Sequence, residues 1–309
     1  MSTTSKSPIE VAEAALMVAT RTLPMFSHQF SPKKFTLPQL LTILVVKKLL
    51  KVDYRGVTIM LRDWPELTKT IELKSVPHYT TLQKASKRIL AFDSAMNLLY
   101  ATAEYALENP ANIDLAAIDS TGLETGHISP YFLERCNNGR IPIRNTRMTK
   151  WPKLALIADT KTHVILTALA TYGPCSDCAH FKDAIELIPD GTHIKKLLAD
   201  AGYDSEKNHV LANEMFGIET VIPPTVGPKR QTLPKKPYRR KMATDFDHES
   251  YRHRVQVETV MSMIKRNLGD ALAGRSEQSR NSEMILMTIT HNVMIVLLSL
   301  IAKELFYRA

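Results

Sequence analysis

Two short apolar segments that each end on an aspartate constrain the fold of this chain more than any other feature. They read NIDLAAID, residues 112–119, and IKKLLAD, residues 194–200. Between them, the segments 153–159 (KLALIAD) and 163–171 (HVILTALAT) have the length and apolar content of strands, with the turn sequence DTKT at their join. The pattern predicts a hairpin that lies between the two aspartate strands in the sequence.

Helical segments follow the hairpin. We expect helices at 177–188 and 205–217, on either side of the second aspartate strand, and a last short strand at IETVIP, residues 218–223. Strands that pair first as a hairpin and then alternate with helices are typical of a mixed sheet with helices on both faces. The predicted fold class is therefore α/β.

Residues 1–110 are predicted to be entirely helical. Apolar residues recur at helical spacing in 37–51, and the shorter segments 55–64 and 79–90 repeat the pattern. The region is basic, through Lys33, Lys34, Lys47, Lys48, Lys51, Arg55, Lys84, Lys87 and Arg88. Short helices with basic faces suit a helix-turn-helix-like DNA-binding module. A helical bundle with ordinary solvated lysines explains the same pattern equally well.

The charge balance of the chain favours a polyanionic partner. Its 309 residues carry a formal net charge of +9, and basic proteins of this length most often bind nucleic acid. Three cysteines are too few for a disulfide framework, which fits a reducing cytosol. We expect no signal peptide, because the N-terminus lacks a basic start followed by an apolar core.

One apolar run, residues 284–302, resembles a membrane span in composition. His291 and Asn292 lie at its middle, where a bilayer would make them energetically costly. We therefore expect a buried helix in the core of a soluble protein.

Three acidic residues are candidates for a metal site. Asp119 and Asp200 end the two apolar strands, and Glu258 lies on a helix predicted farther along the chain. Each residue is weak evidence of a site by itself; an aspartate after a strand, for example, is commonly a turn residue. Three carboxylates brought together repel one another and cannot all stay ionised unless cations bind. Such a cluster suits two Mg²⁺ ions about 4 Å apart that promote phosphoryl transfer.

The segment YRHRVQVETVMSMIK, residues 251–265, predicts a helix with two stripes. At 100° per residue, four polar side chains fall within about 60° of one another, namely Tyr251, Arg254, Glu258 and Lys265. The core-facing band beside them consists of Val257, Val260, Met261, Ile264 and Leu268. The polar stripe therefore borders the buried face, where a cleft would be. A solvated flank with scattered charges is the alternative.

Residues 223–247 are predicted to form a proline-rich and strongly basic loop that leads into this helix. The segment has no apolar periodicity, and a loop this long inside a compact domain is usually functional or disordered. Its basic residues are too dense to be buried, so we expect them to lie along DNA: Lys229, Arg230, Lys235, Lys236, Arg239, Arg240 and Lys241.

The spacing of the polar stripe, Y-x2-R-x3-E-x6-K, resembles the signature of bacterial and archaeal insertion-sequence transposases of the Asp-Asp-Glu class. AIDSTGLE around Asp119 and LADAGYDS around Asp200 are similar to the first and second aspartate blocks of that family. The hairpin WPKLALIADTKTHVI and the helical segment SVPHYTTLQKASKRI resemble it too. The resemblance covers residues 36–300 in outline. It implies a ribonuclease-H-like catalytic domain at 111–309, preceded by a helical, DNA-binding domain at 1–110.

The resemblance also implies an activity. The three carboxylates would hold two Mg²⁺ ions, with Mn²⁺ as a substitute, and the rest of the stripe, Tyr251, Arg254 and Lys265, would contact DNA phosphates near the cleaved bond. The protein would cut element ends and join them to target DNA, as a homodimer or higher assembly on double-stranded DNA in a prokaryotic cytoplasm, without a membrane partner. Two rivals are a nuclease of the same fold that does not join strands, and a decayed or host-adopted copy that only binds DNA.

Cysteine and histidine give a weaker signal. Cys175, Cys178 and His180 lie close in sequence, with Cys136 upstream, and could bind zinc. A second pair at the proper spacing is missing, so small thiols in the core are favoured.

For five further residues, ordinary structural roles compete with functional ones. Trp151 and Trp64 could stack on a flipped base, although core packing is favoured. Asp159 is expected in the hairpin turn and Asp204 at the start of a helix, both outside the site. Asp177 is a weaker candidate for a supporting role, because the resembled family often has an acidic residue at the start of this helix.

Overall fold

A computed structural model describes residues 4–30, 32–107, 112–125, 151–225 and 233–308, with 297–308 described by backbone only. The chain divides into two compact units. The first comprises Met1–Pro110, Met263–Gly269 and Ser282–Ala309, and the second comprises Ala111–Ser262 and Asp270–Asn281.

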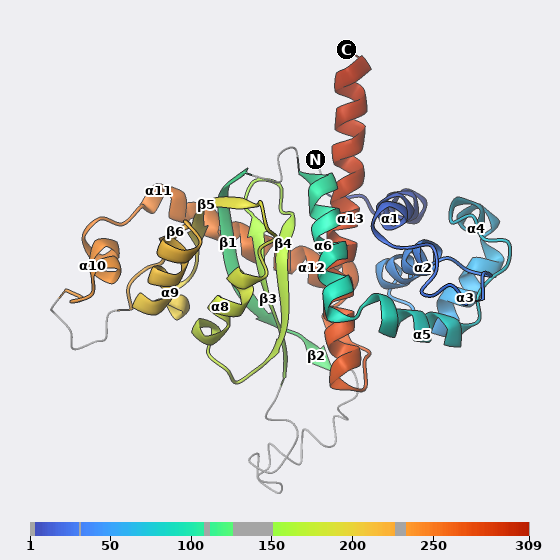
Figure 1. The fold of residues 1–309 in the computed structure, drawn as a ribbon, viewed down its shortest axis with the longest axis horizontal. Helices are drawn as coiled ribbons and strands as arrows, with labels where there is room; N and C mark the ends of the chain where they lie inside the picture. The colour runs from blue at the N-terminus through green and yellow to red at the C-terminus, as the bar shows by residue number, and fades with distance from the viewer. Residues whose placement is uncertain (1–3, 31, 108–111, 126–150, 226–232, 309) are drawn as a thin grey trace, which may run out of the picture. The chain divides into compact units, whose positions relative to one another are not determined.

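The N-terminal part of the first unit is helical, as predicted. Its described elements are α1 (Pro8–Thr22), α2 (Leu37–Leu49), α3 (Tyr54–Asp63), α4 (Pro65–Thr70), α5 (Tyr79–Ile89) and α6 (Phe92–Ala106) (Figure 1). The start of α2 shows why the sequence folds this way. The Thr36 side chain accepts from the backbone N–H of Gln39, and the Gln39 side chain accepts from that of Thr36, a reciprocal cap.

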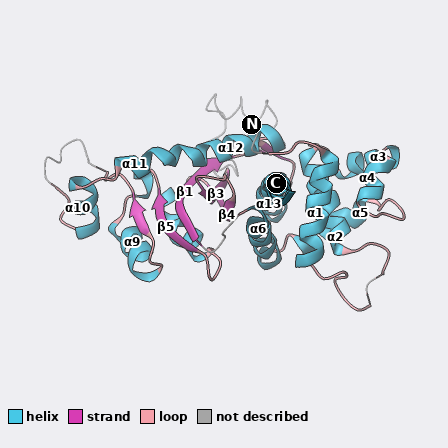
Figure 2. Ribbon diagram, turned by 90° about the horizontal axis from the view of Figure 1, so that it is seen from above, coloured by secondary structure: helices cyan, strands magenta, loops and turns pink. Residues whose placement is uncertain are grey.

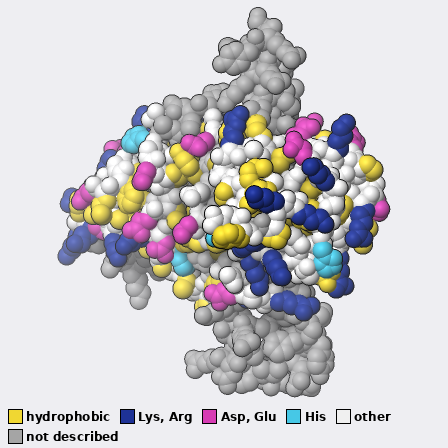
Figure 3. All heavy atoms as spheres, turned by 45° about the vertical axis from the view of Figure 1, so that its right-hand side comes forward, with side chains coloured by type: hydrophobic (Ala, Val, Ile, Leu, Met, Phe, Trp, Pro, Cys, Tyr) yellow, Lys and Arg dark blue, Asp and Glu magenta, His cyan; other side chains and the backbone are white. Residues whose placement is uncertain are grey.

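Two of the basic residues in this unit are buried, which differs from the expected basic faces. Lys48 donates to Glu283 at 2.9 Å, and the ammonium of Lys47 lies 4.6 Å from the centre of the Tyr54 ring. The other basic residues named above are exposed. Figure 3 shows Lys and Arg side chains spread over one face of the molecule, with acidic side chains among them. Whether the unit binds DNA stays a prediction.

The long C-terminal helix α13 (Glu277–Arg308) contains the apolar run. Met284, Met287 and Val296 are fully buried, and the Asn292 amide donates to Thr102 of α6 at 3.1 Å. The expected buried helix is therefore confirmed for its described side chains. Within the described part of the chain, no helix is long and apolar enough to cross a bilayer.

The second unit is built on a five-stranded mixed sheet. Its strands, in spatial order, are β4 (Ile165–Tyr172), β3 (Pro152–Asp159), β1 (Asn112–Gly122), β5 (His193–Leu198) and β6 (Glu219–Val221). β1 is antiparallel to β3, and β3 to β4, whereas β1, β5 and β6 run parallel. The predicted hairpin and mixed sheet are confirmed. A separate short pairing joins β2 (Glu124–Thr125) to β7 (Ala271–Leu272).

Helices flank this sheet on both sides. The helical elements between residues 177 and 268 are α8 (Asp177–Glu186), the 3₁₀ turn η3 (Ala201–Tyr203), α9 (Glu206–Val210) with its π-helical extension η4 (Leu211–Met215), α10 (Pro237–Thr244), α11 (His248–Tyr251), the 3₁₀ turn η5 (Arg252–Arg254) and α12 (Val255–Leu268). In Figure 1, α8 lies in front of the sheet and the first turns of α12 run behind it. Figure 2 shows α9 and α11 on opposite sides of the strands.

Three predicted boundaries differ from the structure. The basic loop at 223–247 contains a helix, α10, which Pro237 begins in its first turn. The helix expected from residue 251 is interrupted by η5, so regular α-geometry begins only at Val255. β1 continues three residues beyond Asp119, because its pairing with β3 runs on to Gly122.

Candidate active site

The register of the parallel strands brings the two predicted aspartates together. The last pair that β1 and β5 form is Ala117 with Leu198. Two residues farther along each chain lie Asp119 and Asp200. Asp200 follows the end of β5 and caps η3, where its carboxylate accepts from Gly202 N–H at 2.8 Å. Both aspartates therefore lie at the same edge of the sheet, where parallel strands end.

Arg254 brings Glu258 into the same group. Its guanidinium contacts Asp119 Oδ2 at 3.5 Å and donates to the Glu258 carboxylate. The four-residue spacing of Arg254 and Glu258 makes them neighbours on a helix surface, a pairing that the sequence pattern already contained. Arg254 is 19% exposed and Glu258 is 50% exposed. The guanidinium thus links the first strand of the sheet to the start of α12.

The carboxylates of Asp200 and Glu258 lie close enough to Asp119 to affect its ionisation. Burial raises the pKa of Asp119, and the carboxylates of Asp200 and Glu258 raise it further. The backbone N–H of Ser120, which donates to Asp119 at 2.7 Å, and the Arg254 guanidinium oppose this rise. A raised pKa means that the folded protein disfavours a further negative charge at Asp119.

Tyr251 lies at the margin of this carboxylate group. Burial raises the pKa of its hydroxyl; Arg254 opposes the rise, whereas Asp200 and Glu258 reinforce it. Its ring packs edge to face on Phe246, with 5.1 Å between the ring centres. The predicted members of the polar stripe at Tyr251, Arg254 and Glu258 therefore gather beside the two aspartates.

The three carboxylates are chemically suited to bind a hard divalent cation, but their side chains are not arranged around one point. Carboxylate oxygens are the ligands that Mg²⁺ prefers. Within the described residues, no three His, Cys, Asp or Glu side chains converge as a ready metal-binding group. The positive charge beside these carboxylates is the Arg254 guanidinium, which contacts two of the three. The residues thus suit a metal ion once Arg254 gives up these contacts.

Comparison with known proteins decides the family. The model of the transposase DDE domain family matches residues 110–293, more than half of the chain. The chain belongs to this family of DDE transposases. No curated protein and no solved structure matches it. The mixed sheet with flanking helices is accordingly the ribonuclease-H-like fold of DDE transposases, a family that uses divalent metal ions to act on DNA.

The apolar band of α12 in the transposase is confirmed. Val257, Val260, Met261, Ile264 and Leu268 are all buried. Lys265 is half-buried, whereas its neighbour Arg266 is exposed. This difference agrees with the stripes expected from helical spacing.

A second polar cluster lies next to Asp119. The Ser120 hydroxyl and the Lys153 ammonium both donate to the carboxylate of Asp177, the first residue of α8. Asp177 therefore has structural partners directly beside the aspartate of β1. This placement favours the supporting role considered for it.

Asp204 directly precedes Ser205, the N-cap of α9, close to the helix start that the sequence suggested, and its carboxylate is fully buried. Arg239 of α10 donates two hydrogen bonds to it, from Nε at 2.9 Å and from Nη2 at 2.6 Å. Burial alone would raise the pKa of Asp204, but the His209 ring at 3.7 Å, the Arg239 fork and the Thr225 N–H outweigh it and lower the pKa to about 2. This pair ties the basic segment to the turn after Asp200.

The predicted DNA-binding residues of the basic segment therefore fall into three groups. Arg239 is committed to Asp204, and Lys241 contacts Glu219 at 3.3 Å. Three are exposed and form no ion pair with a described carboxylate, namely Lys235, Lys236 and Arg240. Lys229 and Arg230 lie outside the described residues.

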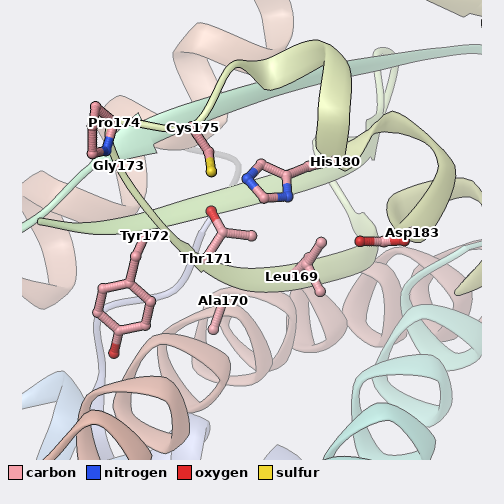
Figure 4. Close-up of a pocket in the computed structure, with 9 residues that line it drawn as sticks. All are labelled: Leu169, Ala170, Thr171, Tyr172, Gly173, Pro174, Cys175, His180 and Asp183. Carbon is pink, nitrogen blue, oxygen red and sulfur yellow. The ribbon is translucent and has the colours of Figure 1, made fainter. Parts of the chain in front are cut away.

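The two described cysteines belong to no group of side chains that could hold zinc. Cys178 accepts from the Asn208 amide at 3.3 Å, whereas Cys175 is exposed, which also differs from the expected buried thiol. Cys175 and His180 line an open cavity of about 450 Å³ between β4 and α8 (Figure 4). No metal-binding group exists among the residues described, and Cys136 lies outside them.

The tryptophans and Asp159 have structural explanations. Trp151 is 45% exposed, so it is not a core residue. One part of its ring fills the space beside Gly173, where an added Cβ would come within 2.1 Å of it. Trp64 lies at the join of α3 and α4. Asp159 accepts from Thr162 N–H at 2.9 Å and closes the hairpin turn, as predicted.

We expect Asp119→Asn to raise the melting temperature of the metal-free transposase at pH 7. The folded-state pKa of Asp119 is raised above its ordinary value of 3.8, so the ionised carboxylate costs stability at neutral pH. The gain should shrink as pH falls through the raised pKa towards 3.8, because the folded wild type then becomes protonated. Thermal denaturation from pH 7 to pH 4 measures this. Asp190→Asn, in an exposed turn, is the control, and an equal gain there would contradict the argument.

Arg239→Ala should destabilise the protein by about 3 kcal/mol at pH 7, because it leaves a buried carboxylate unpaired. The stabilisation linked to the lowered pKa of Asp204 is fully present above 3.8 and is lost as pH falls towards about 2, so the difference from wild type should shrink over that range. Denaturant unfolding measures it.

The matched control for this change is Arg240→Ala, one residue away and exposed. It should change stability by less than about 0.5 kcal/mol but lower the salt slope of DNA binding by about one unit. Equal losses of stability at the two positions would refute the role given to the Arg239–Asp204 pair.

Proposed function

We propose that this protein is a DNA transposase that cleaves element ends and joins the freed 3′-hydroxyls to target DNA. The observation that carries the proposal is the placement of Asp119 and Asp200 just beyond the last β1–β5 pair, with Arg254 joining Asp119 to Glu258. The family match over residues 110–293 supports it. Two element ends have to be held together for joining, so we propose a homodimer or higher assembly on DNA.

The three carboxylates are proposed to hold two Mg²⁺ ions. Bound Mg²⁺ would lower the pKa of the attacking oxygen and stabilise the charge on the leaving oxygen. Asp119 is fixed for this task by the backbone N–H of Ser120, and Asp200 by that of Gly202. These two bonds hold one oxygen of each aspartate, and the other oxygen of Asp119 is the one that Arg254 contacts.

Arg254 has two tasks in this proposal. In the free protein it neutralises Asp119 and Glu258, which would otherwise repel each other. On DNA, its planar fork matches two oxygens of a phosphate, a geometry that lysine cannot reproduce. Tyr251 lies at the margin of the same group. Its hydroxyl, which the raised pKa keeps protonated, would donate a hydrogen bond to a DNA phosphate.

Four residues that the sequence predicted to bind DNA form no ion pair with a carboxylate in the described structure, and they are the proposed DNA contacts outside this centre. They are Lys265 on α12 and, in the basic segment, Lys235, Lys236 and Arg240. Their phosphate contacts would position the duplex and would add salt-dependent affinity without reading sequence.

The function is tested with DNA taken from both sides of the gene. Duplexes that carry any short inverted repeats found there are incubated with the protein and Mg²⁺, and cut ends are mapped. Pre-cut ends are then offered with a plasmid, and joined products are counted. The wild type should cut and join, whereas Asp119→Ala, Asp200→Ala and Glu258→Ala should each do neither while still binding DNA.

Three outcomes would contradict the proposal. Cutting without joining would make the protein a nuclease of the same fold. Binding without either reaction would make it a DNA-binding protein that has lost catalysis. Robust cutting by any one of the three alanine variants would remove that residue from the site.

Lys265→Ala should weaken the binding of pre-cut ends by about 1–3 kcal/mol, as the loss of a charged hydrogen bond does. Arg266→Ala removes the same charge from the next, exposed position and should cost much less. End-binding titrations of the two variants at one salt concentration measure the difference. If both lose the same affinity, α12 contributes only general positive charge.

A further inference from the structure

A buried hydroxyl beside the carboxylate group has no assigned task. Tyr203 is the last residue of η3, the turn that Asp200 caps, and its side chain is 1% exposed. Among the described residues, its hydroxyl has no hydrogen-bond partner. An unpaired buried hydroxyl costs free energy, so a position of this kind calls for an explanation.

The ring of Tyr203 is held in place from several sides. Its backbone N–H donates to Asp200 O at 3.1 Å, and its carbonyl accepts from the Asn208 amide at 3.0 Å. The ring packs against Phe181 of α8, with 6.0 Å between the ring centres. Phenylalanine could make all of these contacts, so packing alone gives no reason for a hydroxyl here.

The hydroxyl is surrounded by groups of the proposed active site. Burial raises the pKa of Tyr203, and the carboxylates of Asp177, Asp119 and Asp200 raise it further, while the Ser120 side chain, which lies within reach of the hydroxyl but without the geometry of a formed hydrogen bond, opposes the rise. The phenol is therefore neutral under all physiological conditions and acts as a hydrogen-bond donor. Every one of these neighbours offers an acceptor oxygen.

Ser120 is the neighbour through which Tyr203 could restrict the position of the Asp119 carboxylate. Its hydroxyl proton is already given to Asp177, which also receives the Lys153 ammonium. The Ser120 oxygen keeps lone pairs that can accept another hydrogen bond. Its backbone N–H donates to Asp119 at 2.7 Å. A bond from Tyr203 to Ser120 would therefore complete a chain from the Asp200 turn to the Asp119 carboxylate.

We propose that Tyr203 is a positioning residue of the transposase: its hydroxyl donates to Ser120 when the site closes on metal, and so fixes Asp119 relative to Asp200. The inference rests on the proposed function, in which both aspartates hold metal. Removing a group that hydrogen-bonds to a metal ligand and orients it typically lowers metal affinity or activity about 10-fold to 100-fold.

The experiment measures two quantities on the full-length chain without DNA. Mn²⁺ is the probe, and its dissociation constant is read from the electron paramagnetic resonance signal of the free ion. Melting temperature is recorded in metal-free buffer. The variants are Tyr203→Phe, Ser120→Ala, their combination and Asp119→Asn. Tyr238→Phe is the matched control, because its hydroxyl contacts Glu214 on an exposed surface.

The inference predicts that Tyr203→Phe lowers Mn²⁺ affinity without lowering the melting temperature. Tyr203→Phe should bind Mn²⁺ about 10-fold more weakly and melt at or above the wild-type temperature, because it removes an unpaired buried hydroxyl. The double variant should bind Mn²⁺ no more weakly than Ser120→Ala alone, since both changes break one chain. Tyr238→Phe should leave Mn²⁺ affinity unchanged.

Other results would overturn the inference. Wild-type Mn²⁺ affinity in Tyr203→Phe would show that the hydroxyl does not orient the site. A large fall in its melting temperature would show that the hydroxyl is structural. Additive losses in the double variant would break the proposed chain through Ser120. Unchanged Mn²⁺ affinity in Asp119→Asn, or no binding by the wild type, would instead refute the proposed metal site itself.

Discussion

Repulsion between carboxylates at one edge of a sheet is the constraint on which this structure depends. The pairing of β1 with β5 puts Asp119 and Asp200 side by side, and Glu258 joins them from α12. In the free protein the Arg254 guanidinium contacts two of the three carboxylates and provides the compensating charge. The Arg254–Asp119 contact thereby links η5 to β1.

Similar compensation recurs around the same edge of the sheet. Lys153 is paired with Asp177, and Lys196 of β5 contacts Asp247 at 2.6 Å, just before α11 begins. Arg239 holds the buried Asp204. These pairs attach α8, α11 and α10 to the sheet and to the turn after Asp200. They also explain why several basic residues of a basic chain are engaged inside the protein and are not available to DNA.

Much of the fold and the candidate site could be predicted from the sequence. The strands were visible because they are short apolar runs between turn residues, and Asp119 and Asp200 because each follows such a run. The core band of α12 followed from helical spacing. The break at η5 was missed because local 3₁₀ geometry leaves no periodic signal, and α10 was missed because its surroundings are proline-rich and basic. The pairing of Asp204 with Arg239 and the surroundings of the Tyr203 hydroxyl involve residues that are distant in sequence, so no local pattern announces them. The pairing of Arg254 with Glu258 was readable from their four-residue spacing.

The central claim is that Asp119, Asp200 and Glu258 form one metal site that Arg254 occupies in the free protein. Anomalous diffraction from crystals of the protein grown with Mn²⁺ tests it most directly, because it locates the ion and the guanidinium in the same map. The account predicts Mn²⁺ coordinated by carboxylate oxygens of these three residues, with Arg254 no longer bound to Glu258. Mn²⁺ bound elsewhere, with the Arg254 contacts to Asp119 and Glu258 intact, would contradict it.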